Sequence, residues 1–389
     1  MSGRGGDHNM IYFDNSATTK PYKEVLESFL TVSSEYFGNP SSLHSIGGQA
    51  ERLLTQARDQ VAKLLKVRPA EIYFTSGGTE SNNMAIKGAA QLNRNKGRHI
   101  ITSSVEHASV LAVMEQLSGE GFDITYLPVD QNGRVSVDDI DKAIRKDTIL
   151  ISIMQVNNEV GTIQPIAEIG ELLKKHPNIL FHVDSVQAIG KVSLSLYKNR
   201  VDFCSLSAHK FHGLKGTGVL FVREGARLAP LLSGGNQERK MRSGTENVAG
   251  FVALAKALRI TMGKSELGIT NMKKIQSSLR KELNEIEGVN IHTPLEGAAP
   301  NILNFSLEGI KSEVFIHALE QEGVFVSTTS ACSSKKKSPS KTLLAMGIAE
   351  KLADSSIRIS LTFDNTEEEA RAVITAIKKC ANQLRKVMK

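Results

Sequence analysis

The chain has 389 residues, of which 40% are hydrophobic and 23% are charged. This composition is typical of folded globular proteins and excludes a largely disordered or fibrous chain. Single hydrophobic cores stop growing near ~250–300 residues, so two domains are expected. The formal net charge is +7, but most basic residues alternate with acidic ones, so direct nucleic-acid binding is not expected.

No stretch approaches the ~18 uninterrupted apolar residues of a membrane span. The first nine residues, MSGRGGDHN, lack the apolar centre of a secretory signal. A cytoplasmic protein that does not insert into a membrane is therefore expected. Three cysteines, Cys204, Cys332 and Cys380, are far apart and odd in number. They predict neither a disulfide framework nor a zinc site, and no metal site is expected.

Short β-rich runs alternate with helical patterns over the first part of the chain. Stretches such as HASVLAVMEQL and IAEIGELLKKH carry apolar residues at helical spacing. This alternation predicts an α/β fold with a mainly parallel, seven-stranded sheet covered by helices. The predicted strands lie in residues 71–76, 98–104, 122–129, 148–156, 178–185, 201–207 and 216–222.

The pattern changes near residue 247, where two long helical stretches run to about residue 287 without a strand between them. Short strands then alternate with helices, which predicts a smaller α+β domain. The strands are expected in residues 289–293, 301–307, 324–328 and 357–361. The predicted division is a leader and small-domain segment in 1–14, a large domain in 15–262 and a small C-terminal domain in 263–389.

Polar residues follow several predicted strands at the edge where ligands bind in open α/β sheets. Gly77, Gly78 and Thr79 precede a helix and have the composition of a phosphate-binding turn, although turn chemistry alone also explains them. His107 stands at a strand-to-helix junction, where a lone histidine is usually structural. Asn158 lies in NNEVG, in which amide-capped turns are an equal alternative.

Asp184 and Lys210 have the strongest chemical character among these residues. Asp184 follows a mostly apolar run, so it requires a hydrogen-bonding or cationic partner, or else it caps a helix. Lys210, in SLSAHKFHG, follows another such run, where burial suits a lysine to Schiff-base chemistry. Pyridoxal phosphate requires a lysine, an acid for its ring nitrogen, a flat partner and phosphate donors, and all four occur at predicted strand ends.

Nine ordered motifs resemble those of the NifS/IscS-like cysteine desulfurases, within the class V aminotransferases, over residues 10–389. They are YFDNSATT, GNPSSLH, FTSGGTESNN, EHAS, VNNEVGTIQPI, HVDSVQAIGK, SAHKFHGLKGTGVL, MRSGTEN and SACSS. The resemblance implies the fold type I architecture of pyridoxal-phosphate enzymes. It also implies a transferase that converts L-cysteine to L-alanine and leaves the sulfur as a persulfide on Cys332.

The resemblance also implies a role for each matching residue. Lys210 would hold pyridoxal 5'-phosphate as a Schiff base, Asp184 would pair with the ring nitrogen, and His107 would stack on the ring. Asn158 and Arg358 would hold the substrate carboxylate. The remaining cofactor contacts would be Gln187 on the phenolic oxygen and Gly78, Thr79, Ser207, His209 and Thr245 at the phosphate, with Thr245 coming from the second subunit of a homodimer.

Cys332 lies in a segment rich in Ser and Lys, STTSACSSKKKSPSK, outside any apolar pattern, whereas Cys204 in VDFCSL fits a packed core. Neighbouring lysines, Lys335 to Lys337, favour a thiolate at Cys332 if they approach it. The persulfide would pass to an acceptor protein, for which an iron–sulfur scaffold, a tRNA-thiolation enzyme and a thiamine-pathway protein are all compatible. A selenocysteine lyase, another class V enzyme and a non-catalytic scaffold remain alternatives.

Overall fold

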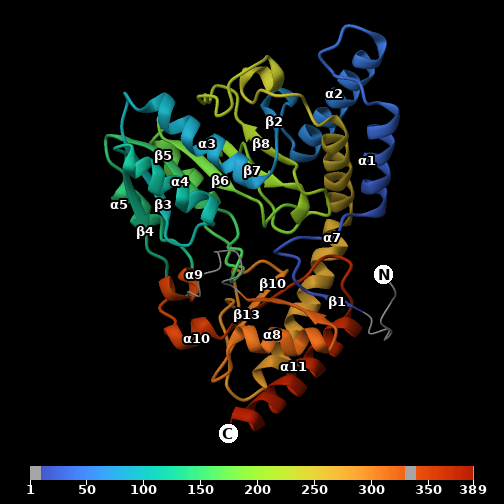
Figure 1. Cartoon of the computed structure of the whole chain (residues 1–389). Coiled ribbons are helices and arrows are strands. Elements are labelled where there is room, and N and C mark those ends of the chain that lie inside the picture. Colours follow the sequence, from blue (N-terminus) through green and yellow to red (C-terminus); the bar gives the residue numbers. More distant parts are fainter. Residues whose placement is uncertain (1–9, 329–338, 389) are drawn as a thin grey trace.

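The computed structural model describes residues 10–328 and 339–388. Figure 1 shows an upper part built around a large sheet and a lower part built around a smaller one, with α7 (Val248–Asn284) running along both. Within the described ranges, no helix is both long enough and apolar enough to cross a bilayer. The predicted leader, residues 1–9, and the segment carrying Cys332 and Lys335 to Lys337 lie outside the described residues.

The upper sheet has seven strands in the order β2-β8-β7-β6-β5-β3-β4. All neighbouring pairs are parallel except those made by β8, which is antiparallel to both β2 and β7. The prediction of a mainly parallel, seven-stranded sheet is therefore confirmed. The strands are β2 (Ile72–Thr75), β3 (His99–Ser103), β4 (Asp123–Leu127), β5 (Thr148–Met154), β6 (Leu180–Asp184), β7 (Phe203–Ser207) and β8 (Gly218–Val222).

Helices cover both faces of this sheet. Consecutive residues of β5 point to opposite faces, and Leu150 packs in one buried cluster with residues of α3 and α4, whereas Ile151 packs in another with residues of α2, α6 and α7. Because both faces are buried, the strands read as continuous apolar runs. The helices before α7 are α1 (Lys23–Glu35), α2 (Ser45–Leu65), α3 (Gly78–Asn93), α4 (Ala108–Gly119), α5 (Val137–Ala143) and α6 (Ile166–Leu172).

The region from residue 247 to 287 differs from the prediction of two helical stretches. It forms one helix of 37 residues, α7, which continues through Gly263 and Gly268. At Gly268 an added Cβ would lie 2.3 Å from Cδ1 of Phe363. The absent side chain therefore makes room for a phenylalanine ring, and tertiary packing offsets the weak helix propensity of glycine.

The lower part contains a four-stranded antiparallel sheet in the order β12-β13-β10-β9 and a parallel pair, β1-β11. Since β1 comes from the N-terminal end, both ends of the described chain contribute to this part, as Figure 1 shows. The predicted boundary at residues 262 and 263 stays a prediction. The elements are β1 (Ile11–Tyr12), β9 (Val289–Ile291), β10 (Ile302–Leu307), α8 (Ser312–Gln321), β11 (Val324–Phe325), β12 (Ser327–Thr328), α9 (Lys341–Ala345), α10 (Glu350–Asp354), β13 (Ser356–Ser360) and α11 (Glu367–Met388).

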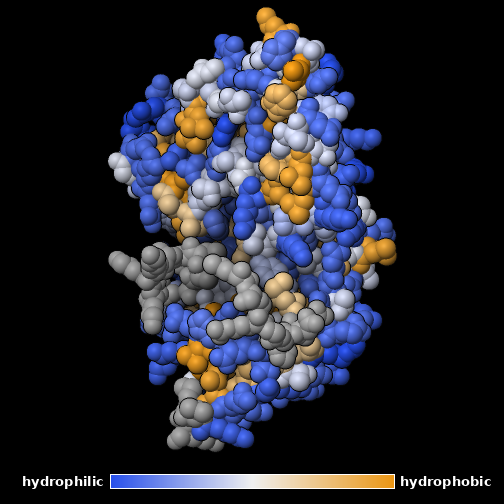
Figure 2. Space-filling view, turned by 45° about the vertical axis from the view of Figure 1, so that its right-hand side comes forward, coloured by the Kyte–Doolittle hydropathy of each residue, from blue (hydrophilic) through white to orange (hydrophobic). Residues whose placement is uncertain are grey.

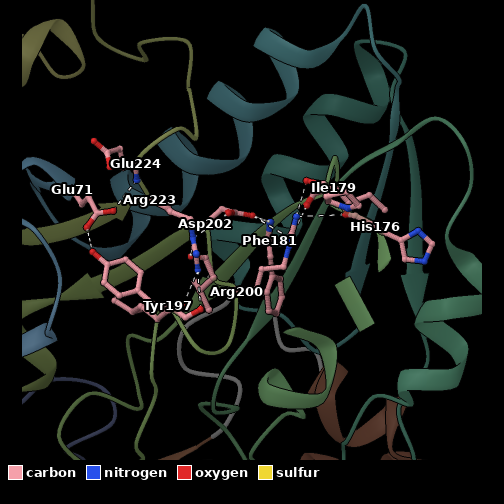
Figure 3. A network of polar contacts seen from close by, with 12 residues as sticks. Glu71, His176, Ile179, Phe181, Tyr197, Arg200, Asp202, Arg223 and Glu224 are labelled. Carbon is pink, nitrogen blue, oxygen red and sulfur yellow. Dashed lines mark hydrogen bonds and ion pairs between the residues drawn. The ribbon is translucent and has the colours of Figure 1, made fainter. Parts of the chain in front are cut away.

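A polar network closes the amino ends of β6 and β7 (Figure 3). Asp202, directly before β7, accepts a hydrogen bond from the backbone N–H of Phe181 at 2.9 Å. It also pairs with Arg200 and Arg223, each at 3.4 Å. The carboxyl ends of β6 and β7 lie at the opposite edge of the sheet and are free to carry a site.

Candidate active site

A cavity of about 640 Å³ lies at the carboxyl ends of the parallel strands. Its wall is formed by residues that follow β2, β3 and β5 and by residues at the ends of β6 and β7, as expected for an open α/β sheet. Most of the predicted site residues line it, namely Gly78, Thr79, His107, Asn158, Asp184, Gln187, Ser207, His209 and Lys210. These residues are therefore brought together around one space large enough for a cofactor and a small substrate.

Lys210 ends the short 3-10 helix η3 (Ala208–Lys210) that follows β7. Its Nζ donates to the carbonyl oxygen of Ala17 at 2.9 Å and to that of Ser16. The N-terminal stretch before α1 therefore crosses the site and contacts the amine directly. The positive charge of Lys210 also contributes to lowering the pKa of both His107 and His209.

Asp184 ends β6 and is buried. Its Oδ1 accepts from the backbone N–H of Val186 at 3.0 Å, and its Oδ2 accepts from Nδ2 of Asn82 at 2.8 Å. The helix-capping alternative is wrong, because a turn rather than a helix follows Asp184, and one carboxylate oxygen caps that turn instead. Among the described side chains, the partner of the other oxygen is an amide rather than a cation.

Asn82 is a site residue that the sequence reasoning missed. It lies inside α3, is 1% exposed, and holds both Asp184 and the hydroxyl of Ser109, the latter at 2.9 Å. One signal in the sequence could have identified Asn82. It lies one helical turn after Thr79, on the helix that begins at the glycine-rich turn. Asn82 therefore fixes the carboxylate from the side of the helix.

His107 caps the start of α4, where its Nδ1 accepts from the backbone N–H of Ser109 at 3.2 Å. This bond places the proton of the neutral ring on Nε2. Burial lowers the pKa of His107, and Lys210 lowers it further, while Asp184 opposes the shift. A neutral, flat imidazole is therefore presented at the cavity wall.

His209 also faces the cavity as a neutral ring. Burial, followed by the charges of Lys210 and Lys215, lowers its pKa to about 4. Its Nδ1 lies 3.2 Å from the hydroxyl of Thr18. The imidazole can therefore exchange hydrogen bonds at the cavity wall without adding a positive charge.

The turn between β2 and α3 has the geometry of an anion site. Gly77 has φ of +151°, and an added Cβ at Gly218 would lie 2.6 Å from the Cα of Gly77, so neither position accommodates a larger residue easily. The first N–H groups of α3, with the exposed hydroxyl of Thr79 and the hydroxyl of Ser207, border the cavity. Such a helix start favours a phosphate group.

Glu106 is a second residue without a predicted role. It is 5% exposed, and its Oε1 accepts from the hydroxyl of Ser103 at 2.6 Å and from the N–H of Met154 at 3.0 Å. Burial, with a smaller contribution from Asp184, raises its pKa to about 8. This carboxyl joins the ends of β3 and β5 and thereby supports the loop that carries His107.

Two of the predicted site residues that the structure describes are not part of the cavity wall. Arg358, in β13, is 2% exposed and bonds to Asp14 and to the backbone oxygen of Asn158. Thr245 is exposed and lies apart from the cavity in the single chain. Cys332 is outside the described residues. Cys204 and Cys380 are both buried.

The residues present fit pyridoxal phosphate. Gln187 lines the cavity, and its Oε1 is buried without a partner in the described part of the chain, as is Oδ1 of Asn82. Buried polar atoms of this kind require a partner. An amine, a carboxylate, a flat ring and an anion-binding helix start surround the same cavity, which matches the four parts of this cofactor. Within the described ranges, no cluster of His, Cys, Asp or Glu is arranged to hold a metal ion.

Comparisons with known proteins show the family to which the chain belongs. Residues 11–373 match the family model described as "Aminotransferase class-V". A "NifS/IcsS protein homolog" of Lactobacillus delbrueckii subsp. bulgaricus is 51% identical, with 94% of this chain and 96% of the relative covered. A "Cysteine desulfurase IscS" of Methanosarcina thermophila is 45% identical, with 97% and 94% covered.

A solved structure described as "NIFS-LIKE PROTEIN" superposes with a TM-score of 0.91 at 42% identity, covering 96% of this chain and 100% of that one. The chain therefore belongs to the class-V aminotransferase family and, within it, to the NifS/IscS-like cysteine desulfurases. The fold type I architecture expected from the sequence motifs is confirmed.

Proposed function

We propose that this protein is a pyridoxal-phosphate-dependent cysteine desulfurase, which converts L-cysteine to L-alanine and transfers the sulfur to Cys332. The observation that carries the proposal is the shared cavity of Lys210, Asp184 and the first turn of α3, in a chain of this family. Pyridoxal phosphate, when bound, supplies an electron sink for negative charge at the substrate α-carbon.

The side chains of the cavity have distinct proposed tasks. Lys210 Nζ holds the cofactor covalently and afterwards removes the proton from the substrate Cα. Asp184 Oδ2, oriented by Asn82, keeps a proton on the ring nitrogen. The N-terminus of α3, with Thr79 and Ser207, holds the phosphate.

The ring itself is proposed to be held from two further directions. His107, which lines the cavity, would cover one face of the ring with its neutral imidazole. Gln187, whose Nε2 donates to the carbonyl oxygen of Ser16 at 3.0 Å, would contact the ring oxygen. His209 and Thr245, the latter from a second subunit, complete the proposed phosphate contacts.

Sulfur transfer is proposed to occur at Cys332. Its thiolate attacks the substrate sulfur, an S–S bond forms, and the C–S bond breaks. The electron pair of the broken bond stays with the carbon skeleton, which takes up a proton and leaves as L-alanine. Asn158 and Arg358 are proposed to hold the α-carboxylate during this transfer because the guanidinium fork matches a carboxylate.

A homodimer is part of the proposal. Leu30, Phe37 and Leu43, on α1 and in the loop that follows it, are 65%, 72% and 106% exposed. Figure 2 shows separate groups of hydrophobic residues on the upper part of the face where α1 and α2 come forward. Exposed apolar side chains of this kind are typical of the centre of a subunit interface.

The acceptor of the sulfur is proposed to be a protein of iron–sulfur cluster assembly, with tRNA thiolation as the second possibility. This proposal follows the IscS names of the relatives. A cytoplasmic site of action, as expected from the sequence, completes it.

Product analysis tests the proposed function. The cofactor-loaded enzyme, given L-cysteine and a thiol reductant, is expected to release L-alanine and sulfide in equal amounts. Formation of a keto acid would indicate a transaminase instead. Turnover of selenocysteine without turnover of cysteine would identify a selenocysteine lyase, and the absence of any product would indicate a non-catalytic scaffold.

A further inference from the structure

Arg358 already holds a carboxylate of its own chain. Its Nη2 donates to Oδ1 of Asp14 at 2.9 Å, and the two side chains are 3% and 19% exposed. Asp14 lies two residues after β1, near the other end of the sequence, and a β-bridge to Ser360 of β13 fixes its backbone. The ion pair is therefore part of the packing between β1 and β13.

The guanidinium lies directly behind the cavity wall. Its Nη1 donates to the backbone oxygen of Asn158 at 2.9 Å, and Asn158 lines the cavity. Its Nε is buried and has no partner within the described ranges. Arg358 thus has one carboxylate partner, Asp14, and one N–H donor without a partner among the described residues. The same guanidinium is the group proposed to hold the substrate carboxylate.

The attraction of Arg358 does not fully offset the cost of burying the charged carboxylate of Asp14. Burial raises the pKa of Asp14 and outweighs the opposing effects of Arg358 and Lys210. A buried ion pair contributes little when desolvation of the two charges offsets their attraction. Asp14 is also the more exposed member of the pair, so it is the side chain that can withdraw towards water.

The same N-terminal stretch links this pair to the reactive amine. Two and three residues after Asp14, the carbonyl oxygens of Ser16 and Ala17 accept hydrogen bonds from Lys210 Nζ. A change at Asp14 is therefore connected to the cavity through the few residues of one turn. The motif YFDNSATT contains all of these positions.

We propose that Asp14 is a specificity-determining residue. Its carboxylate binds the guanidinium of Arg358 in the absence of substrate and is displaced by the α-carboxylate of the amino-acid substrate. This inference rests on the proposed function, since it assigns Arg358 to an amino acid. A ligand that carries an amine but no carboxylate cannot replace Asp14. The replacement of Asp14 by a substrate carboxylate therefore favours the binding of amino acids over that of simple amines.

Ligand binding to the cofactor-loaded enzyme tests this exchange without turnover. Asp14→Asn keeps an oxygen acceptor and removes the competing charge. It is expected to lower the Kd of L-alanine, measured by calorimetry, about five- to tenfold, because an anion then meets an uncompensated guanidinium. The Kd of ethylamine, which has the same amine and no carboxylate, is expected to stay unchanged.

Asp364→Asn is the matched control. Asp364 is exposed and pairs with Lys264 at 2.7 Å, so neither Kd is expected to change. Unchanged or weaker binding of L-alanine to Asp14→Asn, or an equal change for ethylamine, would overturn the proposal. If Asp14→Asn does not fold, as judged by circular dichroism, Asp14→Ala replaces it. Lack of alanine and sulfide production by the wild type would sink the proposed function separately, because these affinities are measured without turnover.

Discussion

Lys191 Nζ donates a hydrogen bond to the backbone oxygen of Lys210 at 3.3 Å. Lys210 lines the cavity, whereas Lys191 is buried at 9% exposure. Burial and, to a smaller extent, the charge of Lys210 lower the pKa of Lys191 to about 8. A second, buried amine therefore supports the backbone of the proposed Schiff-base lysine.

The free energy of unfolding is expected to depend on pH because the amine of Lys191 is buried. Between pH 8 and the ordinary lysine pKa of 10.5, the unfolded state binds more protons at Lys191 than the folded state, so the free energy of unfolding rises with pH in this window. Lys191→Met removes this dependence. The wild type is expected to gain about 2 kcal/mol relative to the variant between pH 7 and pH 10.

Urea unfolding at the two pH values measures the difference. Lys198→Met, which changes an exposed lysine in the same stretch, is the matched control. A difference between wild type and Lys191→Met that stays constant with pH would contradict the assigned environment of Lys191.

Asn82→Ala is expected to reduce kcat/KM for L-cysteine about 10-fold or more. The substitution removes the donor to Oδ2 of Asp184, and a hydrogen bond to a charged group is worth about 1.5–3 kcal/mol. Asn83→Ala, in the next position of α3, removes an exposed amide that bonds only locally to the oxygen of Thr79 and is expected to keep activity. Equal kinetics for the two variants would refute the role of Asn82.

The three cysteines are expected to differ in sulfur transfer. Burial raises the pKa of Cys204 to about 12 and also raises the pKa of Cys380, so neither supplies a thiolate near neutral pH. Cys332→Ser should therefore abolish the protein persulfide, whereas Cys204→Ser and Cys380→Ser should retain it. Labelled sulfur from L-cysteine, followed by mass spectrometry, locates the persulfide. Label on Cys332→Ser would refute the assignment.

The network at the amino ends of β6 and β7 is expected to stabilise the fold without affecting the site. Asp202→Ala leaves the buried N–H of Phe181 without its acceptor, which should lower the free energy of unfolding by about 2 kcal/mol. The kcat of the folded fraction should stay unchanged because the site is at the other end of the strands.

Asp147→Ala is the control for this network. It removes an exposed partner of Arg145, and such surface pairs contribute about 0–1 kcal/mol. Denaturant titrations compare the two variants. An equal loss in the free energy of unfolding in both variants would show that the buried network contributes no more to stability than an exposed ion pair.

Most of the seven strands were predictable from the sequence because they are apolar runs buried on both faces, whereas the edge strand β4 is partly exposed. The sequence did not predict that β8 is antiparallel to its two neighbours, since an apolar run carries no information on strand direction. The continuity of α7 was also missed. The glycine inside this helix, Gly268, packs against Phe363, which lies 95 positions further along the chain, and the local sequence does not show this contact.

The candidate site was predictable where chemistry follows a strand, as at Asp184 and Lys210. Asn82 and Asp14 were missed because their partners are distant: Asn82 bonds to a residue 102 positions away and Asp14 to one 344 positions away. Neither side chain is unusual in its local sequence. Only the folded arrangement shows what each one contacts.

The 37 residues of α7 extend for roughly 55 Å at 1.5 Å per residue. Its first half contributes Phe251 and Leu258 to the core beneath the large sheet, and its second half contributes Met272 and Leu279 to the core of the lower part. The helix therefore connects the part of the molecule that contains Lys210 with the part that contains Arg358. Under the proposed function, the amine and the guanidinium that hold the substrate therefore belong to two parts of the molecule that pack against one continuous helix.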